Sequence, residues 1–383
     1  MNADGSAFVR PRYGEASLAD VLPSVLSALE VPGASDTLGL EFVLHDIRTV
    51  VVLLLDGFGH HLLPLARLSA PTLTALADGA PVLTAGFPST TPTSLTSLGT
   101  GAPPGSHGVI GFFLRVPGSD RVLNHILWHD DPDPLRWQPL ATQFDRAREA
   151  GVNTYVIGRP EFDGTGLTRA AFRGGRYIGA SDIEVLAEQI LEIARRTTGR
   201  TLIYGYDPDV DKCGHLYGVG SAPWRRAVAD VDHLATILLE RLPRSAALVI
   251  TADHGQVNVP AEHRFDLDAD PRLRAGVAVV AGEPRVRYLH TEPGARDDVI
   301  AAWQEVLGDA AIVMPRELAV AEGWFGPVSD EHLQRIGDVV AACTGDYVVL
   351  ATQTDPPMVA NLIAFHGSAT TAEMTVPLLI GRR

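Results

Sequence analysis

The stretch VVVLLLDGFG, residues 50–59, decides the fold. Its unbroken apolar run is typical of a parallel strand buried on both faces, and it ends at Asp56 followed by glycines. A second run, LVITADHGQ (residues 248–256), repeats the design and ends at Asp253 and His254. Because open α/β sheets place their ligands at the carboxyl ends of the strands, we expect these three side chains to meet at one edge of a sheet.

Strand-like and helical patterns alternate along most of the chain. Apolar periodicity or start signals predict helices over residues 18–29, 62–76, 140–150, 183–196 and 224–242, and strands over residues 82–87, 153–157 and 201–206. This alternation predicts an α/β fold with a doubly wound, mostly parallel sheet flanked by helices. From residue 263 to 344 the pattern changes to two β-like runs, VAVVAG and RVRYLH, and a helix near residues 297–307. We therefore predict a core of residues 1–262 and 345–383, with residues 263–344 forming a smaller inserted α+β subdomain.

The composition restricts the partners. Lys and Arg number 31 and Asp and Glu 46, so the formal net charge of −15 argues against nucleic acid or an anionic membrane as a partner. No apolar window resembles a signal peptide or a membrane span, and the two cysteines, Cys213 and Cys343, cannot build a disulfide framework. We expect a cytoplasmic protein, either a monomer or a homodimer, that acts on a small molecule. An anionic substrate would then need bound cations to attract it.

The segment FPSTTPTSL, residues 87–95, contains a candidate nucleophile. Thr91 precedes Pro92, and a threonine N-cap with proline at the first helical position is a strong helix-start signal. A hydroxyl group there would lie beside free backbone N–H groups, which stabilise phosphate oxygens. Coordination to a divalent metal would lower the pKa of the hydroxyl enough to activate it. Taken alone, the segment fits a purely structural helix cap better than a nucleophile.

A histidine motif adds further metal ligands. In DVDKCGHLYG, residues 209–218, Asp211 and His215 are four residues apart and can reach one ion from the same side. Asp207 and Asp209 are competing acids that spacing alone does not exclude. With His366, the chain offers three aspartates and three histidines, which would divide between two zinc sites. The prediction of two zinc sites depends on the joint occurrence of these residues at strand ends, because each motif alone fits a structural role.

These motifs together resemble the alkaline phosphatase superfamily. The set DGFG, FPSTTPTSLTSLGTG, SHGV, DKCGH, ADHG and FHG is most similar to the nucleotide pyrophosphatase/phosphodiesterase branch and to its relative phosphonoacetate hydrolase. The motifs run in family order from about residue 49 to 381 and cover most of the chain. The resemblance implies a metal-dependent hydrolase of phosphodiester or pyrophosphate bonds. The enzyme would use two divalent ions, for which Zn²⁺ is the expected metal and Mn²⁺ the alternative.

The resemblance also implies a role for each site residue. One ion would be held by Asp56, Asp253 and His254, and the other by Asp211, His215 and His366. Thr91 would contact both ions and attack phosphorus in line, and metal-activated water would hydrolyse the resulting phosphothreonine. Counting back from Thr100-Gly101, which matches the end of the family's nucleophile helix, gives Thr91 and not Thr90 as the nucleophile.

One position departs from the family pattern. Phe112 stands where the phosphodiesterase branch carries an asparagine that helps to hold a phosphate oxygen, so we expect Phe112 to contact substrate and to alter specificity. The enzymatic alternatives are a phosphomonoesterase and a phosphonate hydrolase of the same superfamily. A non-catalytic protein that retains the metals is the alternative from another class, and the complete set of expected ligands disfavours it.

Overall fold

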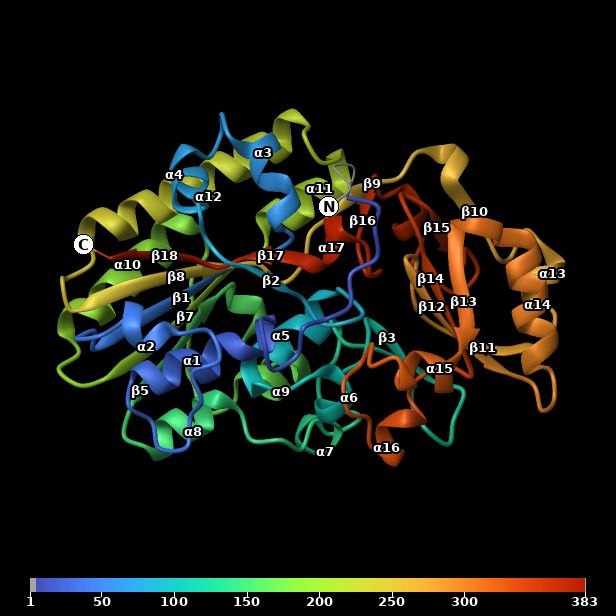
Figure 1. The fold of residues 1–383 in the computed structure, drawn as a ribbon, viewed down its shortest axis with the longest axis horizontal. Coiled ribbons are helices and arrows are strands. Elements are labelled where there is room, and N and C mark those ends of the chain that lie inside the picture. The colour runs from blue at the N-terminus through green and yellow to red at the C-terminus, as the bar shows by residue number, and fades with distance from the viewer. Residues whose placement is uncertain (1–4, 383) are drawn as a thin grey trace.

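A six-stranded sheet lies at the centre of the computed structural model, which describes residues 5–382 (Figure 1). All neighbouring strands are parallel except the edge strand β18, which runs antiparallel to β8. In spatial order the strands are β18 (Leu379–Arg382), β8 (Ala246–Thr251), β1 (Thr49–Leu55), β7 (Thr201–Asp207), β5 (Asn153–Gly158) and β6 (Arg176–Gly179). The predicted α/β class with a mixed, mostly parallel sheet is confirmed.

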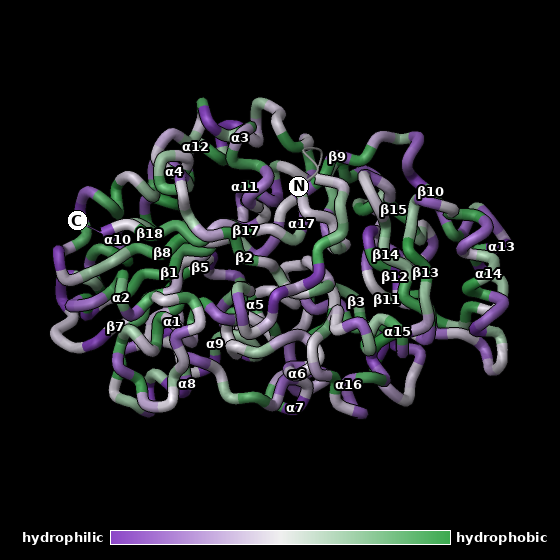
Figure 2. The backbone as a smooth tube through the Cα atoms, viewed as in Figure 1, coloured by the Kyte–Doolittle hydropathy of each residue, from purple (hydrophilic) through white to green (hydrophobic). Residues whose placement is uncertain are grey.

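Helices cover both faces of this sheet (Figure 1). One face carries α3 (Leu63–Ala66), α4 (Pro71–Leu76), α10 (Ile183–Arg196), α11 (Asp209–Tyr217) and α12 (Ala222–Arg241). The other carries η1 (Leu18–Asp20), α1 (Val21–Ala28), α2 (Leu40–Val43), α5 (Thr91–Thr100), α8 (Gln143–Glu149) and α9 (Gly166–Phe172). Both faces of the central strands are therefore removed from water, and Figure 2 shows these strands as the most hydrophobic part of the backbone.

The register of the central strands aligns their carboxyl ends. All seven residues of β1 are buried, and Leu55 pairs with Asp207 of β7 while Leu54 pairs with Thr251 of β8. The next residues along these strands are therefore neighbours at one edge of the sheet. This register explains why Asp56 and Asp253 meet although they are far apart in the sequence. The Gly57 N–H donates a hydrogen bond to the Asp253 carboxylate at 3.0 Å, across a separation of 196 residues.

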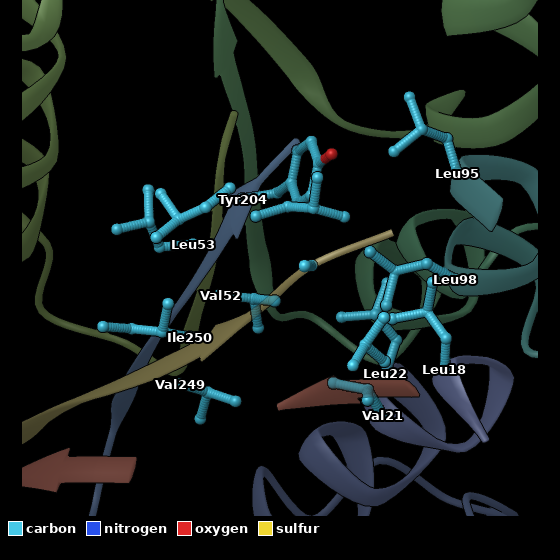
Figure 3. Packing of buried hydrophobic residues seen from close by; sticks show 14 of the residues in the cluster. Leu18, Val21, Leu22, Val52, Leu53, Leu95, Leu98, Tyr204, Val249 and Ile250 are labelled. Atoms are coloured by element: carbon cyan, nitrogen blue, oxygen red, sulfur yellow. The ribbon is translucent and has the colours of Figure 1, made fainter. Parts of the chain in front are cut away.

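Helix α5 is held rigidly beneath this edge. All ten of its residues are buried. Leu98 lies beside Leu18 and Leu22 of the N-terminal helices, and Leu95 lies nearer the sheet edge (Figure 3). At its first turn, the Ser94 hydroxyl donates to the Asp253 carbonyl oxygen at 2.8 Å. Apolar packing at one end and this hydrogen bond at the other fix where the helix begins.

A second sheet of four antiparallel strands follows in the chain. Its spatial order is β11 (Val277–Glu283), β12 (Val286–Thr291), β14 (Val339–Cys343) and β13 (Ala311–Pro315). Helices α13 (Pro271–Arg274) and α14 (Arg296–Leu307) cover its outer face, and α15 (Arg316–Ala321) follows β13 (Figure 1). Leu289 and Trp303 belong to a hydrophobic cluster of this region, whereas Tyr288 and Val340 join the main core. The boundaries at residues 263 and 344 stay a prediction.

The remaining elements are short. The paired strands are β2 (Val82–Thr84) with β17 (Thr375–Pro377), β3 (Phe113–Arg115) with β4 (Val122–Asn124), β9 (Val257–Asn258) with β16 (Ala364–Phe365), and β10 (Arg264–Asp266) with β15 (Val348–Leu350). The short helices are η2 (His60–Leu62), α6 (Pro104–His107), α7 (Pro134–Trp137), η3 (Pro160–Phe162), η4 (Ala261–His263), η5 (Gly308–Ala310), α16 (Asp330–Leu333), η6 (Val359–Asn361) and α17 (Thr371–Met374). In the part of the chain that the structure describes, no helix is long and apolar enough to cross a membrane.

Some predicted elements have different bounds. The helix expected over residues 62–76 is divided among η2, α3 and α4, because Pro71 begins a new helix. The strand expected over residues 82–87 is only β2, and it pairs with β17 outside the central sheet. Thr91 is the first residue of α5, and Thr90 is its N-cap, so the predicted cap position was wrong by one residue.

Candidate active site

The ends of β1 and β8 deliver two carboxylates and one imidazole to the same point. Asp253 and His254 are fully buried, and Asp56 is 4% exposed. The Nε2 atom of His254 lies 3.6 Å from Asp56 Oδ1 and 3.3 Å from Asp253 Oδ2. These three residues form a first group whose potential ligand atoms all lie within 4.8 Å of one another.

A second group lies on the open side of the first. Asp211 is on α11, and His366 follows β16, whose pairing with β9 brings this late segment back to the site. His366 Nε2 is 3.7 Å from Asp211 Oδ1, and its ring stacks on that of His254 at a centroid distance of 3.6 Å. His215 Nε2 lies 3.3 Å from Asp211 Oδ2. The atoms within 4.8 Å of one another belong to Asp211, His254 and His366, so His215 lies at the edge of this group.

Backbone carbonyl oxygens orient all three imidazole rings. The Nδ1 atom of His215 is 2.7 Å from the Ala364 carbonyl oxygen, that of His254 is 3.2 Å from Gly255, and that of His366 is 3.0 Å from Ser89. A hydrogen on each Nδ1 satisfies these carbonyls and leaves the Nε2 lone pair directed at the carboxylates. Burial, and then the neighbouring His254 and His215, lower the pKa of His366 well below its usual range. A neutral ring with a free Nε2 is the form that binds a metal.

The two groups fit divalent cations. Asp56 Oδ1 and Asp253 Oδ2 are buried and have no hydrogen-bond partner among the described residues. Burial and the charges of Asp253 and Asp211 raise the pKa of Asp56 well above its usual range, so the carboxylates repel one another as they stand. A cation relieves this repulsion and takes up the unpaired oxygens. Mixed nitrogen and oxygen ligands suit zinc and other transition metals.

Thr91 places a hydroxyl group between these ligands. It is 7% exposed at the N-terminus of α5, and its Oγ1 donates to His254 Nε2 at 3.2 Å. Proline occupies the second helical position, so the first turn combines the Thr91 hydroxyl group with free N–H groups at the positive end of the helix. The arrangement can bind an anionic oxygen next to the hydroxyl group.

The competing acids Asp207 and Asp209 are engaged elsewhere. Arg159 Nη2 lies 2.5 Å from Asp209 Oδ2 and 3.6 Å from Asp207 Oδ2. Burial and the charge of Asp209 raise the pKa of Asp207 to about 6. Neither acid belongs to a group of convergent ligand atoms among the described residues, which favours Asp211 as the ligand from this segment.

A cavity of about 520 Å³ opens from the two groups. Asp56, Thr91, Asp211, His215 and His366 line one end of it. The remainder is almost wholly apolar and aromatic, formed by Leu95, Phe112, Phe113, Ile126, Leu127, Val156, Ile157, Phe162, Leu167, Phe172, Tyr177, Tyr204, Tyr206, Leu216, Met358, Val359, Leu362 and Phe365. Phe112 thus lies in the cavity, with its ring 4.8 Å from that of Phe113. Among the described lining residues, Lys212 is the only lysine or arginine.

Three residues of the site carry no clear sequence signal. The Tyr206 hydroxyl donates a short hydrogen bond to Asp56 Oδ2, and the Gln256 amide donates to the Asp211 carbonyl oxygen at 3.0 Å and to its carboxylate. Gln256 directly follows ADHG, and Tyr206 is the penultimate residue of β7. Only their position near a strand end could have indicated from the sequence that they lie in the site. Glu283 comes from the tip of the second sheet and also lines the cavity. Nothing in the surrounding sequence AGEPRVR indicates this placement.

Two proteins of known structure have a similar fold. Murine ectonucleotide pyrophosphatase / phosphodiesterase 5 superposes with a TM-score of 0.68 at 19% identity, covering 87% of this chain and 87% of that chain. Phosphonoacetate hydrolase from Sinorhizobium meliloti 1021, in complex with phosphonoacetate, gives a TM-score of 0.68 at 19% identity and covers 88% of this chain and 90% of that one. At this identity the two structures show a shared fold.

The family is identified by a match to a sequence profile. No curated protein sequence matches the chain. The sequence profile described as type I phosphodiesterase / nucleotide pyrophosphatase matches residues 50–369, which include every residue of the two ligand groups and Thr91. The chain belongs to the type I phosphodiesterase / nucleotide pyrophosphatase family.

Proposed function

We propose that the protein is a divalent-metal-dependent phosphodiesterase in which Thr91 is the nucleophile. The observation that carries the proposal is the position of the Thr91 hydroxyl group, 3.2 Å from His254 Nε2 at the start of a helix. His254 belongs to both groups of convergent ligand atoms. A hydroxyl group beside free helix N–H groups and such ligands is suited to attack on phosphorus.

Asp56, Asp253 and His254 would hold one ion, and Asp211 and His366 the other with His215 as a further ligand. When bound, the ions supply positive charge to the reacting oxygens and lower the pKa of the threonine hydroxyl. Zinc is the ion that we propose, with manganese as the alternative.

The chain's own residues orient the reactants. The first turn of α5 would point its free N–H groups at a phosphoryl oxygen, and the Thr91 hydroxyl, 3.2 Å from His254 Nε2, lies where it would reach the ion that His254 holds. Tyr206 and Gln256 hold the carboxylates of Asp56 and Asp211 from behind. Attack on phosphorus by the deprotonated Thr91 oxygen would break the bond to one alcohol, which leaves and takes up a proton, and would link Thr91 to the phosphoryl group that still carries its second ester. Water would then cleave the bond between Thr91 and phosphorus and release the phosphomonoester.

The lining of the cavity favours a diester with an apolar organic group. A phosphomonoester carries an additional negative charge on the phosphoryl group itself, and a phosphonate that bears a carboxylate or a nucleoside polyphosphate carries one outside the reacting centre. Among the described lining residues only Lys212 could pair with such a charge, and it is solvent-exposed. Aromatic rings such as Phe112 and Tyr206 instead offer contact to an aryl or other apolar group. Phosphonate hydrolysis, the activity named for one structural neighbour, is therefore the weaker candidate.

The proposal is tested with purified protein loaded with zinc or manganese. We expect hydrolysis of bis-p-nitrophenyl phosphate at a much higher kcat/KM than p-nitrophenyl phosphate or phosphonoacetate. Mass spectrometry of acid-quenched protein should show one added phosphoryl-ester group on the peptide that contains Thr91. A metal-loaded protein that hydrolyses none of these compounds would be the non-catalytic binding protein. Preference for phosphonoacetate would establish the phosphonate hydrolase instead.

A further inference from the structure

Glu283 is a buried carboxyl group that the reaction outlined above does not use. It ends β11, at the tip of the hairpin that continues through Pro284 and Arg285 into β12. It is 4% exposed and lines the cavity, yet its Oε1 has no hydrogen-bond partner among the described residues. An unpaired buried carboxyl oxygen is costly, so a ligand that completes its hydrogen bonding is expected.

Two loops of the site enclose this carboxyl group. The Thr90 hydroxyl and the Phe112 N–H face it. A Cβ atom added to Gly367 would lie 2.9 Å from Glu283 Cδ, so the loop that carries His366 packs closely against it. Glu283 thus lies between the residue that precedes the nucleophile and the segment that follows the ligand His366. Thr91 and Glu283 line the same cavity.

The surrounding charges leave Glu283 without an ion-pair partner. Arg285 pairs with Glu373, and Arg287 pairs with Asp355, so both guanidinium groups of the hairpin are engaged. Burial is the main cause that raises the pKa of Glu283 to about 8, and the charge of Glu373 adds to it. The Thr90 hydroxyl, the charge of Arg287 and the Phe112 N–H act in the opposite direction. The neutral acid is therefore the prevailing form at pH 7, and it carries an O–H donor.

We propose that Glu283 is a substrate-binding residue whose carboxylic acid donates a hydrogen bond to a non-bridging phosphoryl oxygen. The inference rests on the proposed function for the identity of the bound group. An ionised carboxylate in this place would repel a phosphate, whereas the neutral acid binds it. Phe112 has no side-chain donor, and its N–H already faces Glu283. The second sheet thereby supplies, from the hairpin tip, a phosphoryl contact that the core loop lacks.

Binding of inorganic phosphate to the zinc-loaded protein tests this contact without turnover. Isothermal titration at pH 7 compares the wild type with Glu283→Gln, which keeps a donor and cannot ionise, and with Glu283→Leu, which has none. We expect Glu283→Gln to stay within about 2-fold of the wild-type Kd and Glu283→Leu to weaken binding about 3- to 10-fold. Equal loss in both variants would mean that the carboxylate form is required, and no loss in either would mean no contact. Both outcomes overturn the proposal, as does a wild type that binds no phosphate.

If Glu283→Leu does not fold, the pH dependence of phosphate binding by the wild type and Glu283→Gln provides the test. Above the pKa of Glu283 the wild type loses its donor and gains a negative charge, so its phosphate affinity should fall relative to that of Glu283→Gln. We expect the ratio of the two Kd values to change about 10-fold per pH unit above about pH 8. The charges of Arg287 and Glu373 are common to both proteins over this range. A constant ratio from pH 6 to 10 would overturn the proposal.

These results separate the two proposals. A protein that binds phosphate through Glu283 but hydrolyses no diester would refute the proposed function and leave this contact in place. A diesterase that binds phosphate equally well with leucine at position 283 would refute the contact alone. Melting temperature and zinc content of each variant show that the change is local.

Discussion

The two ends of the cavity differ in almost every physical property. At the sheet-edge end, which we define as Asp56, Thr91, Asp211, Asp253, His254 and His366, acidic and imidazole side chains converge, and two buried carboxylate oxygens have no hydrogen-bond partner among the described residues. At the apolar end, defined by Phe112, Phe113, Ile126, Leu127, Phe162 and Met358, the side chains are hydrophobic, and Leu127 and Met358 are 72% and 62% exposed. Exposed apolar groups at a cavity mouth indicate a ligand that covers them. The difference predicts that reaction and selectivity reside in separate residues.

The nucleophile should give the largest effect. Thr91→Ala removes the hydroxyl group that we propose as the nucleophile, so kcat should fall by at least about 1000-fold for aryl and nucleotidyl diesters alike. Steady-state kinetics with both substrate types measures this. Metal content and melting temperature should stay unchanged, because the Thr91 hydroxyl makes its only described side-chain hydrogen bond to His254.

Thr90→Ala is the matched control for the nucleophile. Thr90 is the N-cap of α5, but its side chain makes no capping hydrogen bond, so its loss should reduce activity only modestly. Equal loss in the two variants would leave the register of the nucleophile undecided. A fully active Thr91→Ala protein would show that another residue is the nucleophile. It would also contradict the assignment of the reaction to the sheet-edge end.

Asp253→Asn should separate metal binding from stability. Asp253 Oδ1 accepts hydrogen bonds from the Gly57 and His254 N–H groups, and an asparagine oxygen can keep both. The asparagine amide would replace the unpaired Oδ2, 3.3 Å from His254 Nε2, with a donor. The metal-free variant should therefore be as stable as the wild type or more stable, by up to about 1–3 kcal/mol.

Calorimetry with and without zinc checks this expectation. Zinc should raise the melting temperature of the wild type, because it binds only the folded protein, and should raise that of Asp253→Asn much less. Elemental analysis should find close to two ions per wild-type chain, and prolonged dialysis against a chelator should abolish activity. Activity that survives the loss of all transition metal would contradict the metal assignment of the whole sheet-edge end.

Asp211→Asn and Asp209→Asn test the second group. Asp211 lies beside His215 and His366, whereas Asp209 pairs with Arg159. We expect Asp211→Asn to lose one ion per chain and at least about 100-fold in kcat/KM. Asp209→Asn should keep both ions and change activity less than about 3-fold, since a half-exposed ion pair contributes little. Loss of metal from Asp209→Asn would reverse this assignment.

Much of the sheet-edge end could be predicted from local sequence, whereas the apolar end and Glu283 could not. Asp56, Asp253 and His254 follow apolar runs, and parallel strands in register bring such positions together. The helix register at Thr91 was misplaced by one residue because an N-cap and a first helical residue differ only in backbone angles. Glu283 reaches the cavity only because the hairpin of the second sheet packs between two loops of the core, and no local pattern encodes that packing.

Phe112→Asn should give the smallest effect, and it should change selectivity alone. The ring of Phe112 lies at the apolar end, and an uncharged hydrogen bond gained or lost there corresponds to about 0.5–1.5 kcal/mol, or about 2- to 13-fold. The wild type should prefer bis-p-nitrophenyl phosphate to p-nitrophenyl thymidine monophosphate, and the variant should shift kcat/KM towards the nucleotide. Both substrates release p-nitrophenol, so the ratio reports on the retained group. An unchanged ratio would make Phe112 a passive wall, and a wild type that already prefers the nucleotide would show that another donor, with Glu283 as the first candidate, serves the phosphoryl oxygen.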